Sequence, residues 1–489
     1  MAAANRKQDP LIVIASNRGP FSFTQKEEGF EIQRGSGGLV TALGALAEKQ
    51  DVLWVAAAMS EDDRAWAEAQ QNGDQLVEGI RMKLITPEAD AYQKYYHEIA
   101  NPLLWFIHHQ LWDSPRSPNI TAETWQAWEE GYVAINRQMA EAIADSVRAE
   151  DRPVIVFPQD YQLYMVPHYL RKEVGERVHI QPFIHIPWPS HDTWSILPKS
   201  IRDALFHSLL QSDRIGFQTK KDAFNFVQTC RFYLPGVESQ GFRDRLFLEG
   251  REVHASAYPI SIDVQKVGAI MKETETQLLK SQLINFVSDR KLILRVDRIE
   301  PSKNVLRGLK AYRTLLEDHP EHQGEVQMLC LLVPSRMEVE EYQDYMQEIM
   351  AEAGMINAIF SNSIWEPVRL IVGDNYPRAI AAMQMYSVLL VNPIRDGMNL
   401  VAKEGALVNQ NDGALVLSEH TGAFEEMGEH ALAVSPFDIY GTAQAIHRGL
   451  TMPLEERQQR AEKLRDTVQN ADVKEWFFNQ VEDAVESSD

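Results

Sequence analysis

Short apolar runs rich in β-branched residues recur along this chain of 489 residues, and amphipathic stretches separate them. These runs are LIVIAS (11–16), VLWVAA (52–57), PVIVFP (153–158), QPFIHI (181–186), KLILRV (291–296), VQMLCLLV (326–333) and YSVLLVNP (386–393). Strands that alternate with helices form βαβ units and parallel sheets, and near-continuous apolar strands indicate sheets that are covered on both faces. The pattern therefore predicts an α/β fold with doubly wound, Rossmann-like sheets.

The chain is too long for one hydrophobic core, so more than one domain is expected. One α/β series ends near 254–269, and a second series opens at the KLILRV run. A final amphipathic stretch, about 471–489, contains Trp476 and should pack on an apolar surface, for which the first domain is a candidate. We predict two Rossmann-like domains, formed by residues 1–258 and 259–470, that face each other across a central cleft.

Charge and cysteine content limit the possible partners. Lys and Arg total 48 against 70 for Asp and Glu, and the net charge is -22. This charge disfavours nucleic acid or an anionic membrane as a partner, and an anionic ligand requires a local basic pocket. Only two cysteines, Cys230 and Cys330, are present, and neither a signal peptide nor a membrane span is apparent. We expect a cytoplasmic protein with small-molecule substrates, and homo-oligomerisation stays open.

The stretch NPIRDGMNLVAKEG (392–405) follows an apolar run and precedes a helical pattern. It is therefore expected to form a turn at the carboxyl end of a buried strand, with Asp396 and Gly397 in the turn. Ligands bind at this end of open α/β sheets. Asp-Gly is also common in ordinary turns, so the residues alone leave both interpretations open.

Two further turns have features of phosphate sites. In RVDRIEPSKN, Arg298 and Lys303 flank a Pro-Ser turn beside a predicted helix N-terminus, which suits a diphosphate. In RGSGGLVTAL, Gly37 and Gly38 precede a helical pattern and would allow the backbone to approach a phosphate. The glycine spacing is neither a Rossmann fingerprint nor a Walker loop. Ordinary surface turns are the alternative for both stretches.

Several polar and aromatic residues could contact a sugar. His185 lies at the end of the predicted strand 181–186, and Asp160 comes just after the predicted strand 153–158. Tyr96 and Trp105 lie in YYHEIANPLLW. A buried histidine, a helix cap and core packing are the respective alternatives. The sequence contains neither H-x-x-x-H nor C-x-x-C, and no metal site is predicted.

Taken together and in order, these motifs resemble a known family. They are SNR, GSGGLVTAL, YYHEIANPLLW, QDYQL, FIHIPWP, RVDRIEPSKN, VPSR, RDGMNLVAKE and SEHTGAFEEM. The chain resembles the trehalose-6-phosphate synthases of family 20, which are retaining nucleotide-sugar glycosyltransferases with the two-domain GT-B fold. The resemblance covers nearly the whole chain. It departs at QDYQL and RIEPSKN, where the family usually has His-Asp-Tyr-His-Leu and Arg-Leu-Asp-Tyr-x-Lys-Gly, so the donor base stays open.

The resemblance implies a role for each matching residue on the donor side. Arg298 and Lys303 would hold the diphosphate and stabilise it as the leaving group, and Asp396 would bind hydroxyls of the donor sugar. Glu404 would accept hydrogen bonds from the ribose. The remaining donor-binding positions are Gly397, Met398, Asn399 and Leu400 at the helix start, and Gly37 and Gly38 from the other domain.

On the acceptor side, the resemblance implies a site for glucose 6-phosphate. Its predicted residues are Arg18, Tyr96, Trp105, Asp160 and Arg336. His185 would lie near the 6-hydroxyl of the donor sugar and the reacting centre. The dianionic phosphate needs local positive charge, which the two arginines would provide.

The implied reaction moves glucose from an NDP-glucose, UDP- or GDP-glucose being favoured, to glucose 6-phosphate with retention. The product would be α,α-trehalose 6-phosphate, and neither a cofactor nor a catalytic metal is expected. Cations at the leaving group would supply the main electrostatic stabilisation. The alternatives are another phosphorylated acceptor (glycerol 3-phosphate or a cyclitol phosphate) and a catalytically silent sugar-phosphate sensor.

Overall fold

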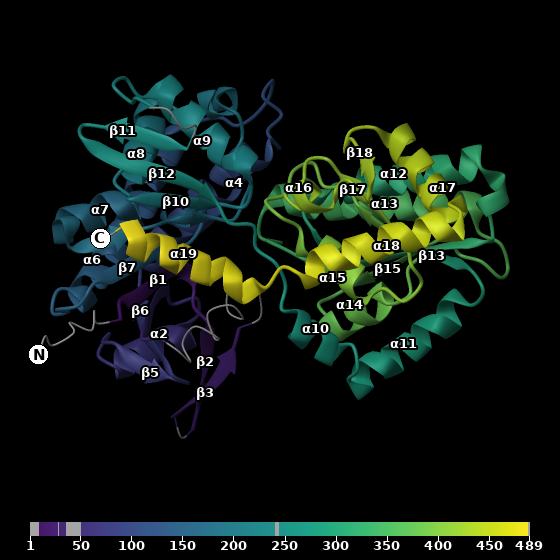
Figure 1. Cartoon of the computed structure of the whole chain (residues 1–489), viewed down its shortest axis with the longest axis horizontal. Coiled ribbons are helices and arrows are strands. Elements are labelled where there is room, and N and C mark those ends of the chain that lie inside the picture. Colours follow the sequence, from purple (N-terminus) through teal and green to yellow (C-terminus); the bar gives the residue numbers. More distant parts are fainter. Residues whose placement is uncertain (1–8, 28, 36–49, 240–243, 488–489) are drawn as a thin grey trace, which may run out of the picture. The chain divides into compact units, whose positions relative to one another are not determined.

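The structure is a computed structural model that describes residues 9–27, 29–35, 50–239 and 244–487. The chain divides into two compact units, 1–259 with 474–489 and 260–473 (Figure 1). Within the described residues, no helix is both long and apolar enough to cross a membrane.

The first unit is built on a six-stranded sheet with the order β5-β6-β4-β1-β7-β8. Its strands are β1 (Leu11–Arg18), β4 (Val52–Ala57), β5 (Gln75–Val77), β6 (Ile80–Ile85), β7 (Val154–Pro158) and β8 (Val178–Ile180). All neighbours are parallel except β5 and β6. Ile14 of β1 lies between Trp54 of β4 and Phe157 of β7, and all three are buried, as apolar strands covered on both faces require.

A smaller sheet and a hairpin contain the other strands described for this unit. The four-stranded sheet has the order β11-β12-β10-β9, with β9 (Phe183–Ile184), β10 (Arg214–Phe217), β11 (Arg245–Leu248) and β12 (Arg251–Ala257). The hairpin pairs β2 (Phe21–Lys26) with β3 (Gly29–Arg34). The main helical segments are α2 (Glu61–Ala69), α3 (Ala89–Gln93), η1 (Lys94–Leu104), α4 (Trp105–His109), α5 (Ala122–Gln126), η2 (Ala127–Val133), α6 (Ala134–Val147), α7 (Val166–Val174), α8 (Lys199–Leu209) and α9 (Lys220–Tyr233).

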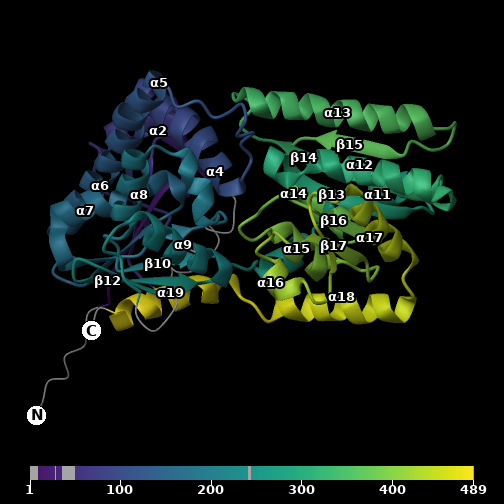
Figure 2. The same ribbon diagram turned by 90° about the horizontal axis from the view of Figure 1, so that it is seen from above.

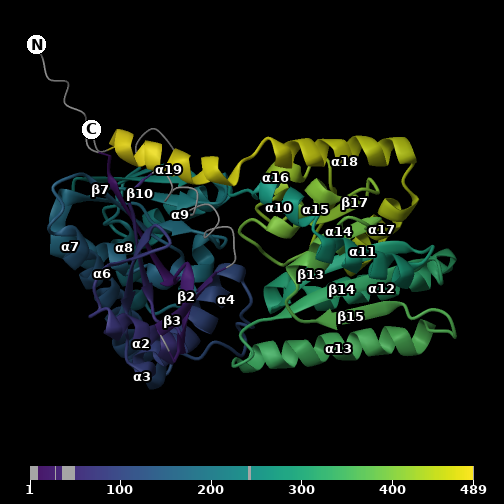
Figure 3. The ribbon, with the colours of Figure 1, turned by 90° about the horizontal axis from the view of Figure 1, so that it is seen from below.

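The last helix of the chain, α19 (Val473–Ser487), packs on the first unit (Figure 3). The Trp476 and Phe477 rings are buried at centroid distances of 4.9 Å from Phe183 and Phe157, respectively. The indole of Trp476 also donates a hydrogen bond to the carbonyl of Tyr258. The aromatic residues of this stretch thus lie on an apolar surface.

The second unit has one parallel sheet with the order β15-β14-β13-β16-β17-β18. The strands are β13 (Lys291–Ile299), β14 (Val326–Pro334), β15 (Val368–Val372), β16 (Val388–Val391), β17 (Ala414–Ser418) and β18 (Leu432–Val434). Numbered within the unit, this is the 3-2-1-4-5-6 order of the Rossmann fold. The order in which successive strands join the sheet therefore reverses between β13 and β16, which is the switch point of the fold.

Helices cover both faces of this second sheet (Figure 2). One face carries α12 (Val305–Asp318), α13 (Glu340–Phe360) and α17 (Ile439–Thr451), which enclose a core of buried aliphatic side chains. The other helices are α10 (Val264–Ile270), α11 (Thr274–Val287), α14 (Tyr376–Met383), α15 (Leu400–Val408), α16 (Phe424–Met427) and α18 (Leu454–Gln469).

The α/β class with doubly wound parallel sheets is as predicted from the sequence. The predicted strand over 181–186 is shorter in the structure, where only Phe183 and Ile184 pair with β10. Pro182, immediately before this pair, has no N–H to donate to the ladder and contributes only its carbonyl, which accepts from the amide of Gly216 at 2.8 Å.

Candidate active site

Two turns meet at the switch point of the second unit. One follows β13 and the other follows β16, and these two strands are neighbours. The amide of Ile394 donates a 2.8 Å hydrogen bond to the carbonyl of Ser302, which joins the two turns. The side chain of Asn304 donates to the carbonyl of Asn392 at 2.9 Å and thus adds a second link. Ligands of doubly wound folds bind in the crevice at this point of the sheet.

Lys303 and Asp396, one from each turn, form an ion pair. Their side chains are only 13% and 14% exposed, so water screens the two charges weakly. The side-chain amide of Asn399 donates to the same carboxylate at 3.0 Å, and its oxygen caps α15 by accepting from the amide of Ala402. A cation, a carboxylate and a helix N-terminus therefore lie within one small region, an arrangement suited to a sugar linked to a phosphate.

The turn after β16 is held from behind by the segment that follows β17. The amide of Gly422 donates to the carbonyl of Asp396 at 3.0 Å, and the amide of Ala423 donates to that of Met398 at 2.8 Å. A Cβ atom at Gly422 would lie 1.8 Å from the carbonyl oxygen of Gly397. Only glycine permits this contact, so the position of the turn depends on it.

A fully buried carboxylate, Glu300, brings together two of the predicted arginines. It lies 3.1 Å from Arg298 and 3.4 Å from Arg336, and it accepts a hydrogen bond from the hydroxyl of Ser302. Arg336 also donates to the hydroxyl of Tyr342 at 2.7 Å. From the sequence, Glu300 was only a departure from the family pattern; the structure shows that it positions both guanidinium groups.

Glu404 and Leu400 lie one helical turn apart on α15, as their spacing predicts. Burial raises the pKa of Glu404 to about 7, and a 2.9 Å hydrogen bond from the hydroxyl of Tyr376 opposes that rise. Tyr376 is the first residue of α14 and was not singled out from the sequence. No sequence signal could pair it with Glu404, because the contact spans 28 residues.

The first unit has its own switch point, between β1 and β7. Arg18 is exposed at the end of β1, and Asp160 follows β7. Asp160 has a φ of 70°, which is rare outside glycine, and such strain is often found at functional sites. Its carboxylate accepts from the backbone amide of His185 at 3.1 Å.

His185 is held in one tautomer by Gln159. The amide nitrogen of Gln159 donates to the carbonyl of Phe157 at 3.1 Å, so its oxygen faces Nε2 of His185, 2.9 Å away. Nε2 must then carry the proton and donate it. Burial lowers the pKa of His185 to about 4, so the ring is neutral at pH 7. Its Nδ1 is thereby a hydrogen-bond acceptor, and the sequence had shown Gln159 only as a replacement of a family histidine.

The two predicted aromatic residues differ in exposure. Tyr96 is half-buried and stacks on Tyr92 at a centroid distance of 5.8 Å. Trp105 is only 5% exposed and stacks on His109 at 4.0 Å, so a ligand could reach only a small edge of its ring. Gly37 and Gly38 lie outside the described residues.

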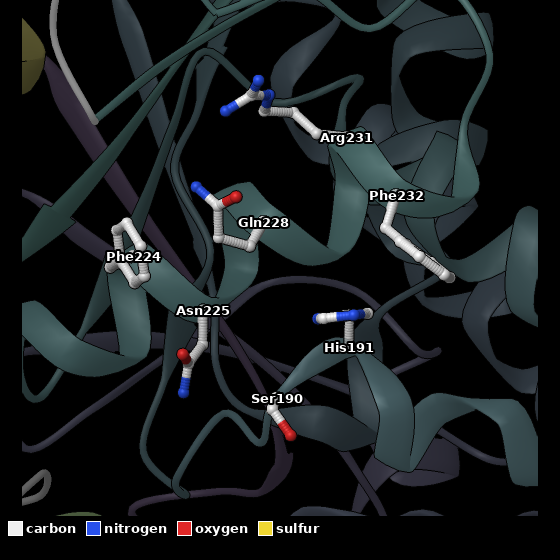
Figure 4. A pocket seen from close by; sticks show the side chains of 7 residues that line it. All are labelled: Ser190, His191, Phe224, Asn225, Gln228, Arg231 and Phe232. Atoms are coloured by element: carbon white, nitrogen blue, oxygen red, sulfur yellow. The ribbon is translucent and has the colours of Figure 1, made fainter.

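A hollow of about 370 Å³ lies elsewhere in the first unit (Figure 4). It is lined by Ser190, His191, Phe224, Asn225, Gln228, Arg231 and Phe232. None of the predicted site residues that the structure describes lines it, and the candidate site is defined by the strand-end turns instead.

In the second unit, the structure thus brings Lys303, Asp396 and Asn399 together, and it places Arg298 and Arg336 around one carboxylate. A Rossmann-type sheet with charged turns at its switch point is typical of enzymes that bind nucleotides. That is the class of protein that the fold and this site define.

Comparisons with known proteins specify the family. The sequence model of Glycosyltransferase family 20 matches residues 10–486. A trehalose-6-phosphate synthase from Sinorhizobium fredii (strain NBRC 101917 / NGR234) is 32% identical over 485 residues, covering 98% of this chain and 99% of that protein. The chain belongs to glycosyltransferase family 20.

Solved structures agree with this assignment. A UDP-forming α,α-trehalose-phosphate synthase from Burkholderia xenovorans, in complex with glucose-6-phosphate, matches with a TM-score of 0.81 and 26% identity, covering 97% of this chain and all of that one. An E. coli structure described as trehalose-6-phosphate bound with UDP-2-fluoro glucose matches with a TM-score of 0.84 and 27% identity, covering 97% and 98%. The predicted family and the GT-B fold class are confirmed.

Proposed function

We propose that this glycosyltransferase moves glucose from UDP-glucose to glucose 6-phosphate and produces α,α-trehalose 6-phosphate and UDP. The observation that carries the proposal is the pair of joined turns at the second switch point, where Lys303 faces Asp396 beside the start of α15. The Burkholderia relative, which is UDP-forming and binds glucose-6-phosphate, supports both the base and the acceptor.

On the donor side, Arg298 and Lys303 would bind the diphosphate, and Asp396 would accept from hydroxyls of the sugar. The amides at the start of α15, together with Gly397 and Met398, would face the phosphates, because a helix N-terminus carries partial positive charge. Asn399 and Leu400 would line the same side, and Glu404 would accept from the ribose hydroxyls. Gly37 and Gly38 keep their proposed role at the phosphates.

On the acceptor side, Arg18 and Arg336 would bind the 6-phosphate of glucose 6-phosphate. Tyr96, Trp105 and Asp160 would contact its sugar ring. Neutral His185, through Nδ1, would accept a hydrogen bond from the 6-hydroxyl of the donor sugar, because Gln159 already accepts the proton of Nε2.

The proposed transfer retains configuration and uses no protein nucleophile. The 1-hydroxyl oxygen of the acceptor bonds to the anomeric carbon of the donor as the bond from that carbon to the diphosphate oxygen breaks. The leaving diphosphate receives the bonding electrons, and one of its oxygens takes the hydroxyl proton. Arg298 and Lys303 stabilise its developing charge, and loss of one such group typically costs about 10²–10³ in rate.

The test is a screen of donors against acceptors with purified protein. UDP-, GDP- and ADP-glucose are each incubated with glucose 6-phosphate or glycerol 3-phosphate, while the nucleoside diphosphate and the sugar product are measured. An α,α-1,1-linked disaccharide phosphate formed from UDP-glucose is expected. Turnover with glycerol 3-phosphate alone would refute the acceptor, and binding without turnover would leave a sugar-phosphate sensor.

We also propose a cytoplasmic location, for which the two free, buried cysteines Cys230 and Cys330 are the support. The net charge of -22 supports small molecules rather than nucleic acid as partners. Assembly into a homo-oligomer is a separate prediction, and light scattering coupled to gel filtration measures it.

A further inference from the structure

Three histidines and a glutamate gather at the far end of α12 in the second unit. His319 follows α12, Glu321 and His322 lie in the next short turn, η7 (Pro320–His322), and His447 lies on α17. The other end of α12 begins beside Lys303. The cluster is therefore at the amino edge of the parallel sheet, opposite the proposed donor site.

The potential ligand atoms of three of these residues lie close together. One atom each from His319, Glu321 and His447 lies within 4.8 Å of the other two. Nδ1 of His319 is 3.2 Å from the carboxylate of Glu321, and the rings of His319 and His447 stack at 3.7 Å. Imidazole nitrogens and one carboxylate oxygen are the ligand set that Zn²⁺ and similar transition metals take in proteins.

The fourth residue, His322, orients one of the ligands. Its Nε2 is 3.0 Å from Nδ1 of His447, so Nε2 is the nitrogen of His447 that could bind a metal. Histidine ligands commonly make such a hydrogen bond through their second nitrogen, which fixes the tautomer and the ring plane. His322 is only 6% exposed, as expected for a supporting group rather than a solvated one.

The backbones that carry the ligands are fixed by packing. Leu315 and Leu316 of α12 and Ala443 and Ile446 of α17 are all buried in the same core, next to the two ligand histidines. A metal bound here would thus join two rigid helices, and little backbone order would have to be gained on binding.

We propose that His319, Glu321 and His447 bind one Zn²⁺-class transition-metal ion, with His322 holding the ring of His447. The rings of His319 and His447 are within 12° of parallel, so their lone pairs do not converge as they stand. Binding must turn the His319 ring about its broad χ2 torsion, and this turn gives up the stacking on His447 and the 3.3 Å contact of Nε2 with Gln444. Water can fill the remaining position, because Glu321 is 58% exposed.

The test measures binding of Zn²⁺ alone to chelator-treated full-length protein. Calorimetry and competition with a chromophoric chelator should show that the wild type binds one Zn²⁺ ion tightly per chain. His319→Ala and His447→Ala should each abolish this tight binding. Glu321→Gln, an exposed change that should not disturb folding, should weaken binding at least tenfold. His322→Ala should weaken it about 10–100-fold, as lost supporting bonds do.

His207→Ala is the matched control, because His207 is an exposed histidine on α8 of the first unit. It should keep the full affinity and stoichiometry. If Glu321→Gln and the double variant His319→Ala/His447→Ala bind Zn²⁺ as the wild type does, the site is elsewhere and the proposal is wrong. The measurement needs no substrate, so its outcome is independent of the proposed transferase activity.

Discussion

The sharpest prediction concerns Gly422, whose Cα hydrogen faces the turn that carries Asp396. In Gly422→Ala, the new methyl group would lie 1.8 Å from the carbonyl oxygen of Gly397 and 2.8 Å from its carbonyl carbon. Real Cβ atoms essentially never approach another atom closer than 3.0 Å. The turn must therefore retreat by at least 1.2 Å, the difference between this limit and the 1.8 Å distance to the oxygen of Gly397. Both partners are backbone, and no side-chain rotation can relieve the clash.

The size of the effect follows from what the retreat breaks. The hydrogen bonds from Gly422 to Asp396 and from Ala423 to Met398 each contribute about 1 kcal/mol. Crowding adds about 1–3 kcal/mol, so the unfolding free energy should fall by roughly 2–4 kcal/mol if the bonds are partly kept. A displacement of about 1 Å in a positioning group can lower turnover by about 10²-fold.

The assay compares UDP-glucose turnover and thermal unfolding of Gly422→Ala with those of Gly354→Ala. Gly354 lies inside α13, and nothing lies within 4 Å of the position its Cβ would take. Alanine there should raise the unfolding free energy by about 0.5–1 kcal/mol and leave turnover unchanged. If Gly422→Ala turned over UDP-glucose as fast as the control, the turn would not need its observed position, and the steric reasoning would be refuted.

Three further predictions concern charges at the same site. Lys303→Ala should lower kcat/KM by about 10²–10³ because the leaving diphosphate loses a cation; an unchanged kcat/KM in steady-state assays would contradict its assigned role. Glu300→Gln keeps the shape of the side chain but removes the charge that holds Arg298 and Arg336, so KM for both substrates should rise several-fold. Glu300→Asp keeps the charge, and its KM values should lie between those of the wild type and of Glu300→Gln. Calorimetry with each substrate separately checks that both affinities change. Glu404, with a folded pKa of about 7, should be protonated below that pH, so the affinity for UDP-glucose measured without acceptor should fall as pH decreases through 7. Glu404→Gln should abolish this inflection, and its persistence would assign it to another group. The pKa of Glu404 is higher in the folded state (about 7) than its ordinary value of 4.5, so its ionisation lowers the free energy of unfolding as pH increases through that interval. Glu404→Gln should therefore lose less stability than the wild type between these pH values.

Structural features that depend on local sequence were predictable. The VLWVAA run becomes β4 over the same six residues, because β-branched and aromatic side chains suit a strand buried on both faces. The Asp-Gly turn after β16 was placed correctly for the same local reasons. Three strands have no comparable apolar run, namely the short strands β5 and β8 and the polar hairpin strand β3. Pairing with neighbouring strands, rather than local sequence, holds them in the extended conformation.

Contacts between distant residues were not predictable. Glu300 contacts Arg336 across 36 residues, and Gln159 orients His185 across 26 residues. Each of these residues could equally have been a solvated polar side chain, and only the fold brings the pairs together. The positive φ of Asp160 was hidden for the same reason, since aspartate has no requirement for it; in the structure its amide donates to the carbonyl of Phe183, which is distant in sequence.

The position of α19 determines the order in which the chain can fold during synthesis. Trp476 and Phe477 pack on Phe183 and Phe157 of the first unit, yet they lie on the far side of 260–473 in the chain. All of 260–473 is made before the first unit can bury the surface around Phe157 and Phe183. Amino-terminal domains generally fold first during synthesis, whereas the first unit of this protein can complete its core only after the second unit has been made. The helix that covers this apolar surface is therefore made more than 200 residues later, and apolar surface exposed during folding favours aggregation.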